Sequence, residues 1–92
     1  MELEGFANVW QALEDTPAQA ANMEARSCLM MELARIIREN GWTQSEAAQH
    51  CGVTQPRMND LLRGRIDRFS LDALVNMSAR LGQRVRLELE PA

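Results

Sequence analysis

Polar side chains able to recognise nucleic-acid bases are concentrated between Gly52 and Gly64. If this stretch forms a helix with 3.6 residues per turn, Met58, Leu61 and Leu62 fall on one apolar stripe that anchors it to a core. The opposite side then carries glutamine, asparagine and arginine, which can form bidentate hydrogen bonds with adenine or guanine edges in the DNA major groove. The alternative is a helical hairpin with a solvated polar face, because caps and glycines punctuate any helical protein. We predict that five residues of this stretch face DNA bases: Gln55, Pro56, Arg57, Asn59 and Asp60.

A first helix-start signal lies just before this stretch. Thr43 is followed three residues later by Glu46, which is the pattern of a capping box, so a helix is expected to begin at Gln44. Small side chains at Ala47 and Ala48 allow a partner helix to cross closely. The helix should end before a glycine, Gly52, that favours a left-handed turn.

A second helix-start signal follows 11 residues later at Thr54, with Pro56 in the first turn, where a missing N–H costs little. This second helix is predicted to run to about Arg63 and to stop at Gly64. Two capped helices joined by a glycine turn indicate a helix-turn-helix.

Further helices should surround this pair. Thr16 caps and Pro17 opens a long helix that is expected to end at Asn40, before Gly41. Its inner face is predicted to consist of Leu29, Met30, Leu33, Ile36 and Ile37. Another helix is capped by Ser70 and closed by Gly82, and its inner face is predicted to consist of Leu71, Leu74, Val75, Met77 and Leu81.

The C-terminal segment has a different period. Apolar residues at every second position alternate with charged ones, which indicates a strand. A lone strand leaves its backbone hydrogen bonds unpaired, so we predict antiparallel pairing with the same segment of a second copy. In that arrangement Arg84 and Arg86 would meet Glu88 and Glu90 across the dimer axis. The alternative is a frayed tail. The predicted dimerisation residues are Val85, Leu87 and Leu89.

One succession of motifs runs through residues 43–72: Thr43-Gln44, Ala47-Ala48, Gly52-Val53-Thr54-Gln55-Pro56-Arg57, Asp60-Leu61-Leu62-Arg63-Gly64 and Arg68-Phe69-Ser70-Leu71-Asp72. It resembles the Xre (lambda repressor/Cro-like) helix-turn-helix family, and more narrowly the HigA-like antitoxin and small Xre-regulator branch, over roughly residues 8–90. Near the start, Asn8-Val9-Trp10 fits that branch, whereas Ala12-Leu13-Glu14 stands where Asp-Leu-Gly is usual.

The resemblance implies a five-helix, lambda-repressor-like domain that dimerises on a palindromic DNA operator, often beside its own genes. It also implies that Gln55, Arg57 and Asn59 read bases, and that Gln44, Arg63 and Ser70 bind phosphates. Arginines after the second helix fit the same backbone contacts. The full set predicted to bind phosphates is Thr43, Gln44, Thr54, Arg63, Arg65, Arg68 and Ser70.

Charge is distributed unevenly in this acidic chain, whose formal net charge is −3. Residues 52–70 hold four arginines against two aspartates, a local charge of +2, whereas residues 1–24 hold five acids and no base. All ten cations are arginine, which suits phosphate and guanine, although a genome rich in G and C would give the same bias.

The acidic N-terminal quarter is usually a solvated face, but it would also suit a small basic partner such as a ribonuclease toxin. Its apolar residues recur at helical spacing and indicate a short helix or arm over residues 6–13. The stripe either packs on the core, the commoner outcome, or forms a partner-binding hot spot. The candidate toxin contacts are Phe6, Val9 and Trp10.

Length and composition restrict the class of protein. Ninety-two residues allow one small domain. No apolar run approaches a membrane span and the acidic start does not fit a signal peptide, so a cytoplasmic protein is expected. Cys28 and Cys51 lack CxxC spacing and are expected to be buried, reduced thiols, and with His50 they are too few for a metal site. Neither a cofactor nor enzyme activity is expected, since no catalytic motif is visible.

The sequence therefore predicts a mainly α protein with three segments: an acidic arm or short helix over residues 1–15, a helix-turn-helix domain over residues 16–82, and a dimerisation strand and tail over residues 83–92. The predicted function is sequence-specific transcriptional repression, as the antitoxin of a HigBA-type module that binds both operator and toxin. Two alternatives are a stand-alone Xre regulator and a protein-interaction module whose helix-turn-helix is only structural.

Overall fold

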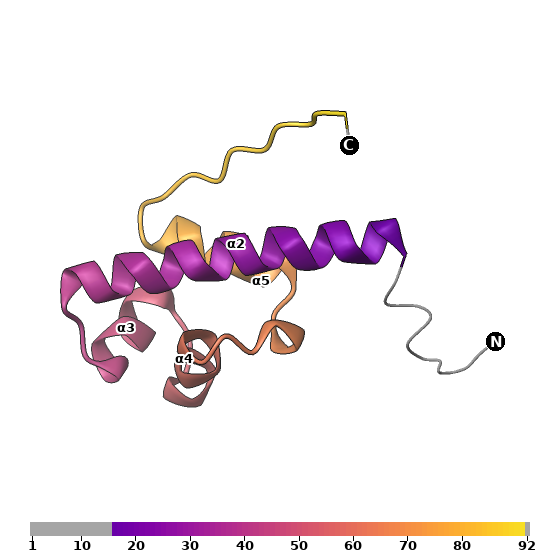
Figure 1. Cartoon of the computed structure of the whole chain (residues 1–92). Helices are drawn as coiled ribbons and strands as arrows, with labels where there is room; N and C mark the ends of the chain where they lie inside the picture. Colours follow the sequence, from indigo (N-terminus) through magenta and orange to yellow (C-terminus); the bar gives the residue numbers. More distant parts are fainter. Residues whose placement is uncertain (1–15, 92) are drawn as a thin grey trace.

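The computed structural model describes residues 16–91. In this part of the chain, four α-helices and one short 3₁₀ helix follow one another, and Figure 1 shows α2 lying across the others. The four α-helices occupy the positions predicted for them, while the arm predicted over residues 6–13 lies outside the described residues. The elements are α2 (Pro17–Asn40), α3 (Gln44–Cys51), α4 (Gln55–Leu62), η1 (Ile66–Arg68) and α5 (Leu71–Arg80).

Helix α2 has the predicted bounds, for the predicted local reasons. The Thr16 side chain accepts a hydrogen bond from the backbone N–H of Gln19 at 3.1 Å, and Pro17 stands at the first position. The helix ends where Gly41 takes up a left-handed conformation, with φ of 67°. None of the helices in residues 16–91 combines the length and apolar character that a membrane crossing requires.

The core lies between α2 and the helices beneath it, and each of them contributes to it. Its largest fully buried side chains come from three helices: Leu33 of α2, Met58 and Leu61 of α4, and Leu74 of α5. Phe69, which the sequence analysis did not place in the core, is also buried there. The core cluster consists of Met30, Leu33, Ile37, Ala47, Ala48, Cys51, Met58, Leu61, Phe69, Leu74 and Met77.

The buried face of α5 is narrower than predicted. Leu74 and Met77 are buried as expected, but Val75 is exposed and Leu71 is only partly buried. The prediction of an inward Val75 was therefore wrong. A polar residue shares the buried stripe instead: Ser78 lies four positions after Leu74 and donates its hydroxyl to the Leu74 carbonyl at 2.8 Å.

Cys28 is exposed, which corrects the prediction that both cysteines are buried. It shares the face of α2 that also carries Met31 and Glu32, at i+3 and i+4, and both of these are exposed. Cys51 is buried as predicted, and burial raises the pKa of its thiol while nearby Arg80 lowers it. Both cysteines are free thiols.

The C-terminal segment follows α5 and runs back alongside α2 without forming a strand within the described residues (Figure 1). Val85 is partly buried, and Val85 and Leu87 line an apolar groove together with residues of α2 and α5. Leu87 is nevertheless 86% exposed, and Leu89 is 102% exposed. A β-strand is defined by backbone hydrogen bonds to a neighbouring strand, and residues 16–91 of one chain supply no such neighbour for this segment. Pairing between two copies stays a prediction.

Candidate nucleic-acid interface

Helix α3 opens with the capping box that the sequence predicts. The Thr43 hydroxyl accepts from the backbone N–H of Glu46 at 3.1 Å, and the Glu46 carboxylate accepts from the Thr43 N–H at 2.8 Å. The helix ends at Gly52, whose φ of 73° lies in the left-handed region that favours glycine. The chain can therefore turn sharply between α3 and α4.

Helix α4 begins at the second predicted cap, Thr54, whose hydroxyl accepts from the backbone N–H of Arg57 at 3.3 Å. Its last helical residue is Leu62 and its C-cap is Arg63, one residue earlier than predicted. Met58 and Leu61 fix the helix to the core. On the outer side, the predicted base-reading residues Gln55 and Pro56 are exposed and Asn59 is half-buried.

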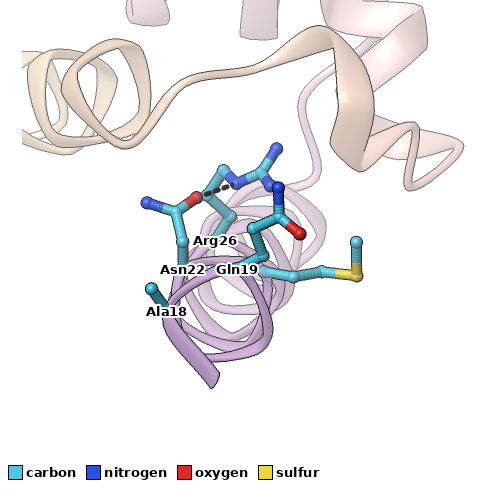
Figure 2. Close-up of a pocket in the computed structure, with 5 residues that line it drawn as sticks. Ala18, Gln19, Asn22 and Arg26 are labelled. Atoms are coloured by element: carbon cyan, nitrogen blue, oxygen red, sulfur yellow. Dashed lines mark hydrogen bonds between the residues drawn. The ribbon is translucent and has the colours of Figure 1, made fainter. Parts of the chain in front are cut away.

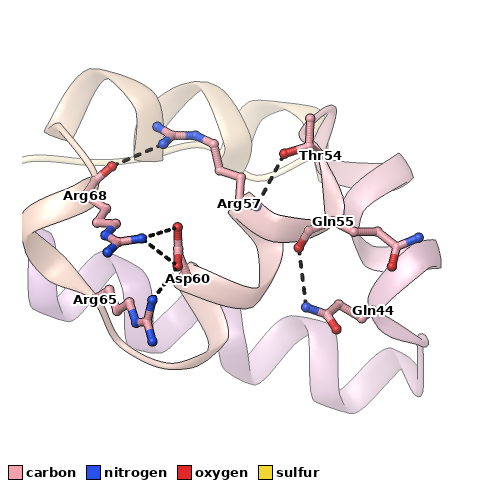
Figure 3. A network of polar contacts seen from close by, with 7 residues as sticks. All are labelled: Gln44, Thr54, Gln55, Arg57, Asp60, Arg65 and Arg68. Carbon is pink, nitrogen blue, oxygen red and sulfur yellow. Dashed lines mark hydrogen bonds and ion pairs between the residues drawn. The ribbon is translucent and has the colours of Figure 1, made fainter.

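The first turns of α3 and α4 are joined directly. The Gln44 side-chain amide donates to the backbone carbonyl of Gln55 at 3.3 Å (Figure 3). One of the predicted phosphate-binding residues therefore contacts the first residue of the predicted reading helix. This contact restrains the angle at which the N-terminal end of α4 is presented.

Arg57 is folded back onto its own domain. Its guanidinium carbon lies 4.4 Å from the centre of the Phe69 ring, a cation–π contact, and its Nη1 donates to the Arg68 carbonyl at 3.2 Å (Figure 3). Both partners follow α4 in sequence. The side chain is partly buried, and its hydrogen bond within residues 16–91 uses only Nη1.

Asp60, the other charged residue predicted to read bases, also has partners within the domain. Its carboxylate forms ion pairs with Arg65 at 3.1 Å and Arg68 at 3.3 Å, and only 15% of its side chain is exposed. Two of the predicted phosphate-binding arginines are thus brought together by a residue that the sequence analysis placed among the base readers.

Arg26 on α2 was missed by the sequence analysis. Its Nη1 donates to the carbonyls of Ile66 and Phe69, at 3.0 and 3.3 Å, so it holds the turn that contains η1. Its Nε donates to the Asn22 side chain at 2.7 Å, and Figure 2 shows the two residues side by side in a pocket on α2. No sequence signal points to this contact, since 40 residues separate donor and acceptor.

A second contact that the sequence did not predict involves the two ends of α3. The Trp42 and His50 rings are stacked with centroids 3.9 Å apart, joining the residue before the α3 cap to the last turn of α3. Trp42 also packs against the core, so the stack connects the last turn of α3 to it.

The helix-turn-helix geometry agrees with the comparison with known families. A family model described as a helix-turn-helix domain matches residues 12–90. The chain belongs to this family. Comparison with curated proteins gave no match. Domains built on a helix-turn-helix place their second helix in the DNA major groove, so this domain's α4 is its candidate reading helix.

Apart from Gln44, which donates to the Gln55 carbonyl, the predicted phosphate-binding residues fall into two groups. Thr43, Thr54 and Ser70 are all exposed N-caps whose hydroxyls accept from their own helices. The arginines follow α4: Arg63 is exposed and forms no ion pair with residues 16–91, whereas Arg65 and Arg68 share Asp60. Arg68 and Ser70 also line one open pocket together with Arg26 and Arg57.

Proposed function

We propose that this helix-turn-helix protein is a sequence-specific transcriptional repressor that reads operator DNA with α4. The observation that carries the proposal is the capped α3–α4 pair, in which the N-terminal end of α4 is exposed while Met58 and Leu61 fix the helix from behind. In helix-turn-helix proteins the N-terminal residues of the second helix contact base edges. Gln55 and Asn59 carry amides suited to adenine, and Arg57 a guanidinium suited to guanine.

The charge pattern supports DNA as the partner despite the acidic net charge. The four arginines of residues 52–70 lie on α4, its C-cap and the turn that follows. Arg63 and Arg68 are exposed, so their guanidiniums are accessible to backbone phosphates. Affinity should consequently fall steeply as salt concentration rises.

Homodimerisation through residues 83–91 is part of the proposal. Leu87 and Leu89 are exposed, and they continue the alternation that begins at Val85. Antiparallel pairing of two such segments would satisfy their backbone groups and set arginines against glutamates. A twofold dimer would bind an inverted repeat with half-sites about one helical turn, ~34 Å, apart.

The finer specialisation that we propose is the antitoxin role in a HigBA-type module. It is supported by the resemblance to HigA-like antitoxins and by the acidic charge of residues 1–24, which complements a basic toxin surface. The candidate toxin contacts Phe6, Val9 and Trp10 lie outside the described residues. A neighbouring gene for a small basic protein would favour this role over that of a stand-alone Xre regulator.

The proposed reading function is tested by separating base contacts from phosphate contacts. Duplexes enriched from a random library by the wild-type protein serve as the operator, and a shuffled duplex is the control. Gln55→Ala and Arg57→Ala should each weaken operator binding by roughly 1–3 kcal/mol and relax preference at one position per half-site. Arg63→Ala should weaken both duplexes alike, because phosphates carry no sequence information.

The measurement is fluorescence anisotropy of labelled duplexes over a range of salt concentrations. An unchanged ratio of operator to shuffled affinity in both α4 variants would show that α4 is not the reader. A wild-type protein without any salt-dependent DNA affinity would instead support the second alternative, an interaction module whose helix-turn-helix is only structural.

A further inference from the structure

The Asp60 carboxylate occupies an unusual position for a residue on a DNA-reading helix. It lies on α4, yet its two ion-pair partners, Arg65 and Arg68, both come from the turn after the helix (Figure 3). A backbone hydrogen bond also joins Asp60 and Arg65, since the Arg65 N–H donates to the Asp60 carbonyl at 3.0 Å. One residue of α4 therefore fixes both arginines relative to the helix.

The arginines keep part of their binding capacity in this arrangement. Each uses Nη1 for Asp60, and neither donates from Nε or Nη2 to any residue in 16–91. Their side chains are 39% and 53% exposed, against 15% for the Asp60 carboxylate between them. The aspartate is thus turned inward while guanidinium donors remain accessible from outside.

The turn that carries these arginines is held from two further directions. Arg26 of α2 binds the carbonyls of Ile66 and Phe69, and Arg57 of α4 binds that of Arg68. The backbone beneath the arginines is consequently fixed, and Asp60 fixes their side chains. Long, flexible arginines that are ordered before binding lose less conformational freedom when a phosphate arrives.

We propose that Asp60 is a positioning residue, which holds Arg65 and Arg68 ready to bind phosphates of the DNA backbone and does not read a base. The inference rests on the proposed function. Removing a negative charge from a DNA-binding surface ordinarily strengthens DNA binding. The positioning role predicts the opposite change in DNA affinity for Asp60. Loss of Asp60 should weaken DNA binding.

The chain offers a matched control in the same turn. Asp67 is exposed and forms no ion pair with any residue that the structure describes. Asp60→Asn and Asp67→Asn therefore change the net charge equally, but only the first releases Arg65 and Arg68. Both full-length variants are measured by anisotropy on the operator duplex and on a shuffled duplex over a range of salt concentrations.

Asp67→Asn should bind both duplexes as tightly as wild type or more tightly. Asp60→Asn should bind both about 3- to 30-fold more weakly and should lower the salt slope by roughly one to two, as the loss of one or two phosphate contacts requires. Equal behaviour of the two variants would overturn the proposal. So would an Asp60→Asn variant that loses discrimination at a single base while its affinity for the shuffled duplex is unchanged, since this would identify a base reader.

A double-mutant comparison separates positioning from a loss of folding. In an Arg65→Gln/Arg68→Gln background, Asp60→Asn has no arginine to release and should not weaken binding further. Further weakening in that background would refute the positioning role. So would unfolding of Asp60→Asn at the assay temperature, if its loss of DNA affinity were the same with and without Arg65 and Arg68. Failure of wild type to bind any DNA would refute the proposed function itself, a different result from failure of the Asp60 variants alone.

Discussion

Replacing Gly52 with alanine tests how the turn between α3 and α4 is held. The residue has φ of +73°, and a Cβ built on it would lie 2.7 Å from the Cζ atom of Arg80 and 2.8 Å from its Nε. Gly41 is a matched control, because it ends α2 with φ of +67° and has no atom within 4 Å of a built Cβ. The two substitutions share the backbone penalty and differ in the contact with Arg80.

The expected magnitudes follow from these two contributions. A left-handed conformation costs an L-residue roughly 1–2 kcal/mol, so Gly41→Ala should lower the free energy of unfolding by about that amount. In Gly52→Ala the flexible end of Arg80 must also move away. Losing a cation from the C-terminal end of α3 should add about 0.3–1 kcal/mol. The total for Gly52→Ala is therefore about 1.3–3 kcal/mol.

Denaturant unfolding followed by circular dichroism provides the assay, with Arg80→Ala and the double variant completing a cycle. In the Arg80→Ala background, the cost of Gly52→Ala should fall to that of Gly41→Ala. If the cost of Gly52→Ala were the same with and without Arg80, the contact with Arg80 would contribute nothing. If Gly41→Ala left stability unchanged, the reasoning from positive φ would be refuted as well.

Two further results are expected. Exposed Cys28 should react with a thiol reagent in the native protein well before buried Cys51, and equal labelling rates would contradict the burial difference. Burial raises the pKa of the Cys51 thiol above its pKa in the unfolded chain. The free energy of unfolding should therefore fall as pH rises through and above the pKa of the unfolded thiol. Deleting the chain from Arg84 onward should give a folded monomer with reduced operator affinity, which sedimentation checks; a dimeric deletion variant would rule out strand pairing. Deleting residues 1–14 should preserve DNA binding and weaken toxin binding, which co-purification with the toxin checks.

The sequence by itself determined where the four α-helices of residues 16–91 begin. Each start depends on a hydroxyl that accepts from an N–H three residues later, as at Thr43 and Thr54, and the turn at Gly52 depends on the residue's own freedom at positive φ. These interactions are local, so their spacing in the sequence is enough to predict them. The apolar stripe of α4 was likewise visible from its period.

Only the tertiary structure decided what the charged side chains of the candidate interface contact. Arg26 reaches carbonyls 40 and 43 residues away, Arg57 lies over Phe69, and Asp60 pairs with arginines of the following turn. The partners of Arg26 depend on how α2 crosses η1, and those of Arg57 and Asp60 depend on the path of the chain after α4. A periodic pattern on one helix encodes neither. The exposure of Cys28 has the same origin, because the path of the neighbouring helices decides which face of α2 is covered.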